Sequence, residues 1–371
     1  MRDSVIARQR EEMTAAGLDA LVAISPENFA YTTGFVVPSQ PLMRWRHNAA
    51  VVARDGRTGL VAVDMEATTV RAKVPGADVR VWGEFTDRPM TALAGLLRDL
   101  GVAEGAIGIE MDYLPAGDHE HLKSLLPAAR LQPADKLYDR MRQLKTPDEV
   151  DLLRRLSRIA DASIAEAFAS VRAGMTEMDL AGALTKGIYA RGAQWFKLMI
   201  IATGERSEYP NVGPTHRVLK AGDLCRVEIF PIIDGYHAGV CRTAVVQQAP
   251  EKAERIWRNL VECKYIVLDM IKPGASTRAI YDAFLKKFGE LGLPPISFVG
   301  HGIGLHLHEE PYLGKYSDSR LEAGMVLGIE PLVYGAGMGF GLQNKDMVAV
   351  TRSGGELLSD VTNTDRLIVV D

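Results

Sequence analysis

The chain has 371 residues, of which 47% are hydrophobic and 24% are charged. This composition is typical of a soluble globular protein, and the length predicts two domains. The net charge of −4 and the lack of a basic run argue against a nucleic-acid partner. No stretch reaches the ~20 apolar residues that a membrane span needs. With no apolar secretion signal and an odd number of cysteines, we expect a cytoplasmic protein with reduced thiols.

The first part of the sequence alternates between helical and strand patterns. Helices are predicted over 4–16 and 90–100, and strands over 20–24, 48–53, 58–63 and 106–110. Such alternation is typical of an α/β domain, which we expect over residues 1–135.

A connector over 136–145 leads to a strong helix start at Thr146–Glu149, Thr-Pro-Asp-Glu. The Thr can cap the helix, the Pro fits its first turn and the Glu completes a capping box. The pattern of Val171–Thr176, a Gly followed by a hydroxyl cap, returns at Ile271–Ser276. Two copies of one unit predict a pseudo-twofold domain over 146–371, with a site at the seam between the copies.

Strand patterns lie between and after the two copies. Residues 224–233 and 237–247 predict a hairpin that turns at Asp234-Gly235. Further strands are predicted over 325–333 and 346–351.

The segment Phe298–Pro311 holds three histidines, two acids and three glycines in fourteen residues. His306 and His308 are two positions apart, so on an extended segment they share one face. Such a density of histidines and acids indicates metal binding or acid–base chemistry rather than a surface bend.

These segments resemble the pita-bread family of prolidases, aminopeptidases P, methionine aminopeptidases and creatinase. The matching segments span nearly the whole chain: Pro26–Tyr31, Thr33–Phe35, Gly222–Leu224, Asp234–Tyr236, Arg242–Thr243, Gly300–Gly304 with His308–Glu309, and Gly328–Pro331. The resemblance implies an α/β N-terminal domain plus an α+β pita-bread C-terminal domain with pseudo-twofold internal symmetry.

The metallopeptidases of this family bind two divalent metals through two Asp, one His and two Glu. The corresponding positions here hold Glu228, Gly239, His301, Glu330 and Lys345. Glycine has no ligating side chain, and lysine brings a positive charge to the place of a cation. We therefore expect no cofactor, with Lys345 compensating the two glutamates. If the alignment slips by one residue, Asp346 is the ligand instead.

Creatinase, the metal-free member of the family, also lacks the second Asp, and its Phe-Pro-Met-Ile-Ala-Gly-Tyr stretch is similar to Phe230–Tyr236. Its substrate-holding arginine falls on Arg46, which implies a homodimer with Arg46 reaching the partner's site. Its catalytic histidine falls on Asn211 and its guanidinium-binding glutamate on Cys241. Creatine itself is therefore not the expected substrate.

Roles follow from these matches. Glu330 and His301 are expected to activate water, His308 to transfer a proton, and Lys345 to balance charge or stabilise an oxyanion. Cys241 is either a thiolate nucleophile or a small buried apolar residue. Substrate contacts are expected from Arg46, Asn211, Glu228 and His237.

The sequence thus predicts a metal-independent hydrolase that cleaves a C–N bond of a small, carboxylate-bearing, amino-acid-like compound. One alternative is a metal-dependent Xaa-Pro dipeptidase with an altered or mononuclear site. It would hold a single Mn, Zn, Co or Fe ion on Glu228, His301 and Glu330. Two further candidates are a lyase on the same scaffold and a non-catalytic binding protein.

Overall fold

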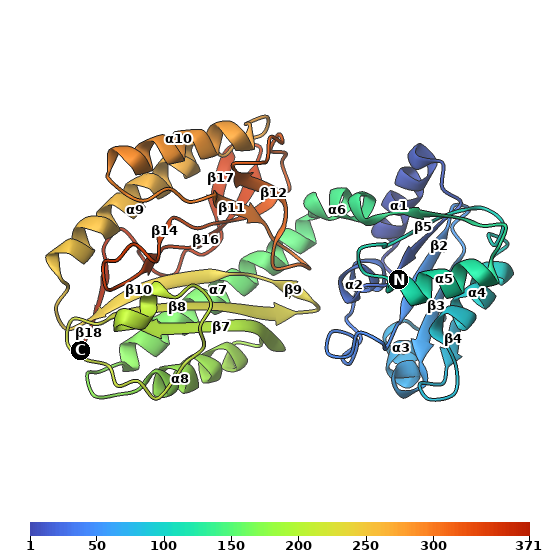
Figure 1. Cartoon of the computed structure of the whole chain (residues 1–371), viewed down its shortest axis with the longest axis horizontal. Helices are drawn as coiled ribbons and strands as arrows, with labels where there is room; N and C mark the ends of the chain where they lie inside the picture. The colour runs from blue at the N-terminus through green and yellow to red at the C-terminus, as the bar shows by residue number, and fades with distance from the viewer. The chain divides into compact units, whose positions relative to one another are not determined.

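The computed structural model describes residues 1–371 as two compact units, Met1–Arg142 and Gln143–Asp371 (Figure 1). The predicted boundary at 135 and the predicted connector differ from this division. Residues 136–143 belong to helix α6 (Asp135–Gln143), which buries Tyr138 and Met141. The Met141 carbonyl accepts a 2.8 Å hydrogen bond from Arg8 in helix α1 (Asp3–Ala16), so most of this segment belongs to the first unit.

The first unit is built on a six-stranded sheet of order β4-β3-β2-β1-β5-β6. The pairs β1/β5, β3/β4 and β5/β6 are parallel, and β1/β2 and β2/β3 are antiparallel. The strands are β1 (Ala20–Ala23), β2 (Ala49–Ala53), β3 (Thr58–Val63), β4 (Val79–Trp82), β5 (Ala106–Ile109) and β6 (Arg130–Pro133). The remaining helices are α2 (Pro26–Thr33), α3 (Ala67–Lys73), α4 (Pro89–Asp99) and α5 (Ala116–Leu125).

This arrangement confirms the predicted α/β domain and its four strands. The sequence did not predict β4 and β6, which lie at the two edges of the sheet. Both edge strands are largely half-buried or exposed, whereas β1, β2 and β5 are buried throughout. Edge strands therefore lack the continuous apolar run that identifies a central strand.

The second unit contains two helix pairs and three sheets. Its first half holds α7 (Pro147–Ser170), α8 (Glu177–Ala190), β7 (Trp195–Thr203), β8 (Leu224–Ile233), β9 (Tyr236–His237) and β10 (Val240–Val246). Its second half holds α9 (Glu251–Met270), α10 (Thr277–Glu290), β11 (Phe298–Gly302), β12 (Glu309–Gly314), β13 (Val326–Ile329), β14 (Leu332–Val333), β15 (Leu342–Gln343), β16 (Asp346–Thr351), β17 (Gly354–Leu357) and β18 (Ile368–Val370).

The sheet orders are β18-β10-β8-β7, with β9 pairing with β8, then β12-β11-β13-β16-β17, and the short pair β14-β15. In Figure 1, α8 lies along the β7 side of the strands, and α9 and α10 lie on the opposite side. The strands between the helix layers carry the side chains of the site.

The internal repeat predicted from the sequence is confirmed. Gly174 and Gly274 both adopt left-handed backbone angles, with φ of 91° and 84°. Gly174 N donates to Leu219 O at 2.9 Å, and Gly274 N donates to Leu321 O at 2.7 Å. The hydroxyl residue two positions after each glycine caps the following helix. The two halves therefore share the left-handed glycine and the hydroxyl helix cap, as well as the pair of helices.

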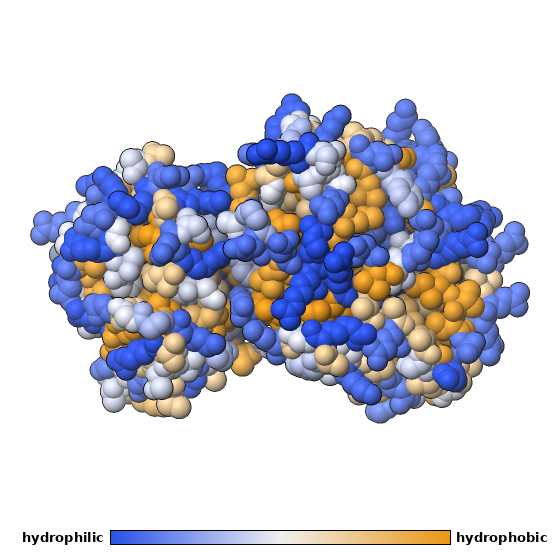
Figure 2. Space-filling view, turned by 180° about the vertical axis from the view of Figure 1, so that it is seen from behind, coloured by the Kyte–Doolittle hydropathy of each residue, from blue (hydrophilic) through white to orange (hydrophobic).

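The surface is mixed in character. On the face of the second unit drawn in Figure 2, strongly hydrophilic side chains form a band with apolar surface on both sides. The chain has no helix with the length and apolarity that crossing a membrane requires. Its three cysteines are buried and unpaired.

Candidate active site

A cavity of about 490 Å³ opens within the second unit. Strands β7 and β8 form one wall with Ile200, Glu228 and Phe230, and residues after β13 and β15 form another. The polar side chains that line it are those of Asn211, Glu228, Ser297, His308, Glu330, Tyr334, Gln343 and Lys345. Both halves of the repeat therefore contribute to one cavity.

Lys345 lies between two carboxylates at this cavity. Its Nζ is 3.0 Å from Glu228 Oε1 and 3.1 Å from Glu330 Oε2, and its side chain is 1% exposed. Burial alone disfavours the charged amine, but the two carboxylates outweigh it and raise the pKa of Lys345. Burial likewise opposes ionisation of Glu330, yet the charges of Lys345 and His301 lower its pKa. Lys345 and Glu330 are therefore both ionised at neutral pH.

Asp346, the next residue, belongs to a different cluster. Its Oδ1 lies 2.9 Å from Arg242 Nη2, and its Oδ2 lies 3.3 Å from Lys264 Nζ. Ser359 Oγ donates a further hydrogen bond to Asp346 at 2.8 Å. Neighbouring side chains on extended backbone point to opposite faces, so only one of the pair can face the cavity. These contacts contradict the slipped alignment, in which Asp346 would be the ligand.

His301 and His308 stack against each other, with ring centroids 3.7 Å apart and planes 13° apart. His301, on β11, is fully buried, and its Nδ1 lies 2.7 Å from the Gly302 carbonyl oxygen. Because a carbonyl only accepts, this contact places a proton on Nδ1, and in the neutral form of the ring a lone pair is left on Nε2. That Nε2 makes no hydrogen bond, although Glu330 Oε1 is 3.3 Å away. The cluster thus holds a buried nitrogen that can accept a cation.

One ligand atom each from His301, His308 and Glu330 lies within 4.8 Å of the others. His308 is exposed to solvent, but partial desolvation of its ring, with the nearby His301 and the charge of Lys345, lowers its pKa to about 4. His308 is therefore neutral at pH 7, the form in which imidazole binds metals. A proton donor near neutrality requires a higher pKa, so this environment favours ligation or proton acceptance over the predicted proton donation.

The prediction that His306 and His308 share a face of a strand is wrong. Strand β11 ends at Gly302 and β12 begins at Glu309, and the backbone between them bends. Glu309 holds this bend: its Oε1 accepts a 3.1 Å hydrogen bond from His306 N, and its Oε2 lies 2.9 Å from Lys145 Nζ. The bend brings His308 against His301, a contact that alternation along a strand cannot predict.

The other predicted site residues of the second unit divide into two groups. Glu228 and Asn211 line the cavity. Cys241 and His237 do not line it; both are buried, and His237 Nδ1 lies 3.1 Å from Gly304 O. Burial raises the pKa of Cys241 well above its usual value. A thiolate is therefore disfavoured, which opposes the nucleophile and supports the small buried residue.

Arg46 belongs to the first unit. Its Nε lies 2.7 Å from Glu84 Oε1, and Glu84 also accepts a 3.1 Å hydrogen bond from Trp45 Nε1. The guanidinium thus has a carboxylate partner within its own unit. Its reach into a partner's site stays a prediction.

A network behind Glu330 was missed by the sequence analysis. Gln343 Nε2 donates to Glu330 Oε2 at 3.0 Å. Gln343 Oε1 contacts the Tyr334 hydroxyl and accepts from Arg226 Nη1 at 3.3 Å. Arg226 and Glu228 are two apart on β8, so their side chains share a face. That spacing was the available signal for Arg226, and Gln343 stands two residues before Lys345 in the same way, whereas no such spacing pointed to Tyr334.

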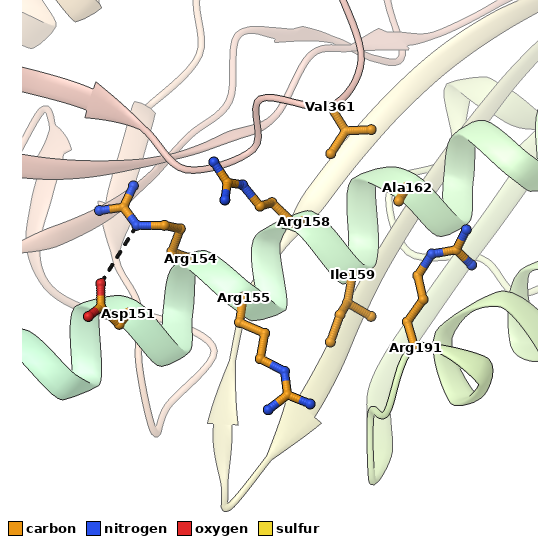
Figure 3. A pocket seen from close by; sticks show the side chains of 8 residues that line it. All are labelled: Asp151, Arg154, Arg155, Arg158, Ile159, Ala162, Arg191 and Val361. Atoms are coloured by element: carbon orange, nitrogen blue, oxygen red, sulfur yellow. Dashed lines mark ion pairs between the residues drawn. The ribbon is translucent and has the colours of Figure 1, made fainter.

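A second cavity, of about 540 Å³, lies along α7 (Figure 3). Arg154 and Arg158 extend to one side of the helix, and Arg155 extends to the other. Arg154 pairs with Glu356 at 2.7 Å and Arg158 with Asp360 at 2.7 Å. This cavity gathers no set of metal ligands or nucleophiles, so the first cavity is the candidate site.

Comparisons with known proteins agree with this architecture. The family model for metallopeptidase family M24 matches residues 151–352, and that for the creatinase/prolidase N-terminal domain matches 6–144. A Xaa-Pro dipeptidase of Pyrococcus horikoshii is 26% identical over 316 residues, covering 84% of this chain and 88% of that protein.

Two solved structures are also similar. Dipeptidase PepE from Mycobacterium ulcerans is 26% identical, with a TM-score of 0.85 and coverage of 99% of this chain and 97% of that one. A Xaa-Pro dipeptidase from Bacillus anthracis is 23% identical, with a TM-score of 0.85 and coverage of 99% of both chains. At that identity, the second likeness supports the fold alone.

These matches correct one prediction. No cofactor was expected, but the family model that covers the site is that of a metallopeptidase family. That prediction was based on the missing metal ligands at positions 239 and 345. It did not consider His301, His308 and Glu330 as one ligand set. A metal-binding site is therefore compatible with this chain, through His301 and Glu330 together with His308, which the alignment did not select as a ligand.

The two family models together cover most of the sequence, and the fold agrees with the structures of relatives over almost its full length. The chain is an enzyme of the hydrolase class that acts on C–N bonds. It belongs to metallopeptidase family M24, with a creatinase/prolidase N-terminal domain.

Proposed function

We propose that the chain is a metal-dependent dipeptidase of the Xaa-Pro dipeptidase type that works with a single divalent ion. The observation that carries this proposal is the convergence of His301, His308 and Glu330, whose ligand atoms lie within 4.8 Å of one another. Two imidazoles and one carboxylate are a common catalytic set for zinc or iron, with positions left open for water and substrate. The Xaa-Pro dipeptidase among the relatives supports the substrate class.

The residues fit one ion better than two. Glu228, which the sequence offered as a ligand, is engaged by Lys345 at 3.0 Å, and Gly239 has no side chain to donate. His308 replaces Glu228 in the proposed set, because its neutral ring stacks on His301 beside the cavity. A mononuclear site on His301, His308 and Glu330 is therefore the form that we propose.

A divalent ion in this set would supply Lewis acidity and an activated water for hydrolysis. The residues around the set hold the proposed ligands in position. Gln343 fixes Glu330 Oε2 at 3.0 Å, and the Gly302 carbonyl fixes the tautomer of His301. Lys345 places a permanent positive charge beside Glu330, where it can stabilise an oxygen that becomes negative during attack on a carbonyl.

The cavity suits a small substrate. Its volume of about 490 Å³ lies within the range of ordinary small-molecule sites, ~300–1,000 Å³. Phe230 and Leu332 give it apolar walls, and Asn211 offers an amide for hydrogen bonding. These features suit a dipeptide with a compact apolar side chain or ring.

The proposal also includes a homodimer in which Arg46 binds the substrate carboxylate in the partner's site. Guanidinium groups bind carboxylates through paired hydrogen bonds. Glu84 holds Arg46 through a single contact, from Nε to Oε1 at 2.7 Å, which leaves the other guanidinium nitrogens for a substrate carboxylate. Analytical ultracentrifugation should give twice the chain mass. Replacing Arg46 by Met should raise KM for dipeptides more than it lowers kcat, and a monomer in solution would contradict this part.

The decisive experiment measures metal content and dipeptide hydrolysis together. The full chain is loaded with Mn, Co, Zn or Fe, freed of excess ion, and assayed with Ala-Pro, Gly-Pro and Ala-Ala. We expect about one ion per chain and a preference for Xaa-Pro substrates. His308→Gln should lose both the ion and the activity, whereas His119→Gln in the first unit should lose neither. Failure of every ion to support dipeptide hydrolysis would overturn the proposal.

A further inference from the structure

Phe230, on β8, fills the space in front of Gly239. Gly239 lies in the chain segment between β9 and β10. A Cβ atom at position 239 would lie 2.3 Å from Phe230 Cε1 and 2.9 Å from its Cδ1. The aromatic ring thus occupies the volume that any side chain at this position would need. A carboxylate cannot reach the cavity from position 239 unless Phe230 moves.

The same ring supports the ammonium group of Lys345. Lys345 Nζ lies 4.9 Å from the centroid of Phe230, within the range of a cation–π contact. Phe230 therefore has two effects on the cavity wall. Its ring leaves no room for a side chain at position 239, and the face of the ring attracts the ammonium group of Lys345.

Gly328 leaves room for the stem of Lys345. A Cβ atom at position 328 would lie 3.2 Å from Lys345 Cε and 3.5 Å from His301 Nε2. Gly328 lies on β13, opposite His301 on β11. A residue without a side chain at this point lets the lysine pass beside the histidine and reach both glutamates.

The ammonium occupies carboxylate oxygens that would otherwise be free to bind a cation. Nζ is 3.0 Å from Glu228 Oε1 and 3.1 Å from Glu330 Oε2. A divalent ion at the same point would meet a positive charge at close range in a buried setting, which is strongly repulsive. Glu330 Oε1, on the other side of that carboxylate, faces His301 and remains available.

We propose that Lys345, supported by Phe230, Gly239 and Gly328, is a built-in cation that limits this site to one metal ion. The ammonium takes the place of a second ion between Glu228 and Glu330. The inference rests on the proposed mononuclear function for the ion itself, but the claim about Lys345 concerns only how many ions enter. It can therefore be judged by counting ions, without reference to turnover.

The test counts ions bound to the full chain by native mass spectrometry after equilibration with Mn²⁺, Co²⁺ or Zn²⁺. Wild type should hold one ion per chain. Lys345→Glu removes the ammonium and adds a carboxylate, so it should hold two. Lys264→Met is the matched control, because Lys264 is also a buried lysine paired with a carboxylate but lies outside the cavity. It should bind the same number of ions as wild type.

Each outcome is decisive. A folded Lys345→Glu variant that binds no more ions than wild type would overturn the inference. If that variant does not fold, Lys345→Met replaces it, and Mn²⁺ should then raise its Tm more than it raises that of wild type. Equal shifts in Tm would again overturn the inference. If wild type binds no ion, the proposed function fails, whereas a gain of one ion in Lys345→Glu still supports the role of Lys345.

Discussion

Lys345 and Asp346 are neighbours in sequence, yet they belong to two buried charge clusters with different surroundings. Lys345 joins Glu228 and Glu330 at the wall of a cavity. Asp346 joins Arg242 and Lys264 in a cluster that lines neither of the two cavities. Buried ion pairs are therefore a poor sign of function by themselves, and access to a cavity distinguishes the two.

The cluster around Asp346 also contacts helix α7 and the backbone of Lys345. Arg242 pairs with Asp161 on α7 at 2.9 Å, as well as with Asp346 at 2.9 Å. It donates a further hydrogen bond to the carbonyl oxygen of Lys345 at 2.8 Å. The structural cluster thus holds the backbone from which the cavity-facing lysine extends.

The largest expected effect is on stability, from Arg242→Met. The variant removes the guanidinium that pairs with two buried carboxylates, Asp161 and Asp346, and breaking a buried pair in this way costs about 3–5 kcal/mol. Urea unfolding should show this loss. Arg158→Met, which breaks an exposed pair with Asp360, is the control and should cost no more than about 1 kcal/mol. Equal losses for the two variants would remove the distinction between sealed and exposed pairs.

For Lys345→Met we expect a large loss of kcat and a smaller loss of stability than for Arg242→Met. Removing a group that stabilises a developing negative charge typically lowers kcat by about 100-fold or more. Its loss of stability should be smaller than that of Arg242→Met, because the cavity lets water or ions approach the two glutamates. Steady-state kinetics on Xaa-Pro dipeptides and urea unfolding measure the two effects. A variant that loses stability but keeps kcat would place Lys345 with the structural cluster.

A smaller effect is expected from Gln343→Leu. Gln343 holds Glu330 Oε2 at 3.0 Å without lying in the proposed ligand set. Residues that orient a metal ligand typically change ion affinity or activity by about 10–100-fold. Titration of the folded, ion-free variant with Mn²⁺ should show weaker binding than titration of wild type. Unchanged ion affinity would show that Glu330 needs no such support.

The smallest effect concerns pH. Burial favours the neutral acid, but Arg242 and Lys264 outweigh it and lower the pKa of Asp346. The folded protein therefore binds this proton less readily than the unfolded chain does. The contribution to stability is full above the unfolded pKa of about 3.9 and is lost as pH falls through the folded pKa. The stability gap between wild type and Arg242→Met should therefore narrow below about pH 4, as measured by urea unfolding across pH.

The sequence identified one part of the site well. The alignment selected Glu228, Glu330 and Lys345, and the structure brings these three side chains together. Matching segments on separate strands could do this because strand register fixes which residues meet. The capping box at Thr146 was equally readable, since it depends only on residues close in sequence.

Other parts of the site could not be predicted in this way. His308 meets His301 through a bend that the adjacent Glu309 holds together with Lys145, which is distant in the sequence. The stacking of Phe230 across Gly239 likewise depends on the packing of two strands, which composition does not specify. The alignment selected both histidines but did not show that they meet, and the expected absence of a cofactor was wrong.

The crowding around Gly239 and Gly328 also has a consequence for molecular evolution. Gly328 leaves room for the stem of Lys345, and Phe230, which fills the space before Gly239, supports its ammonium group. Substitutions at these four positions should therefore have been acquired together, and reversal of one alone should be selected against. Among family sequences, lysine at the position of Lys345 should co-occur with glycine at the position of Gly239.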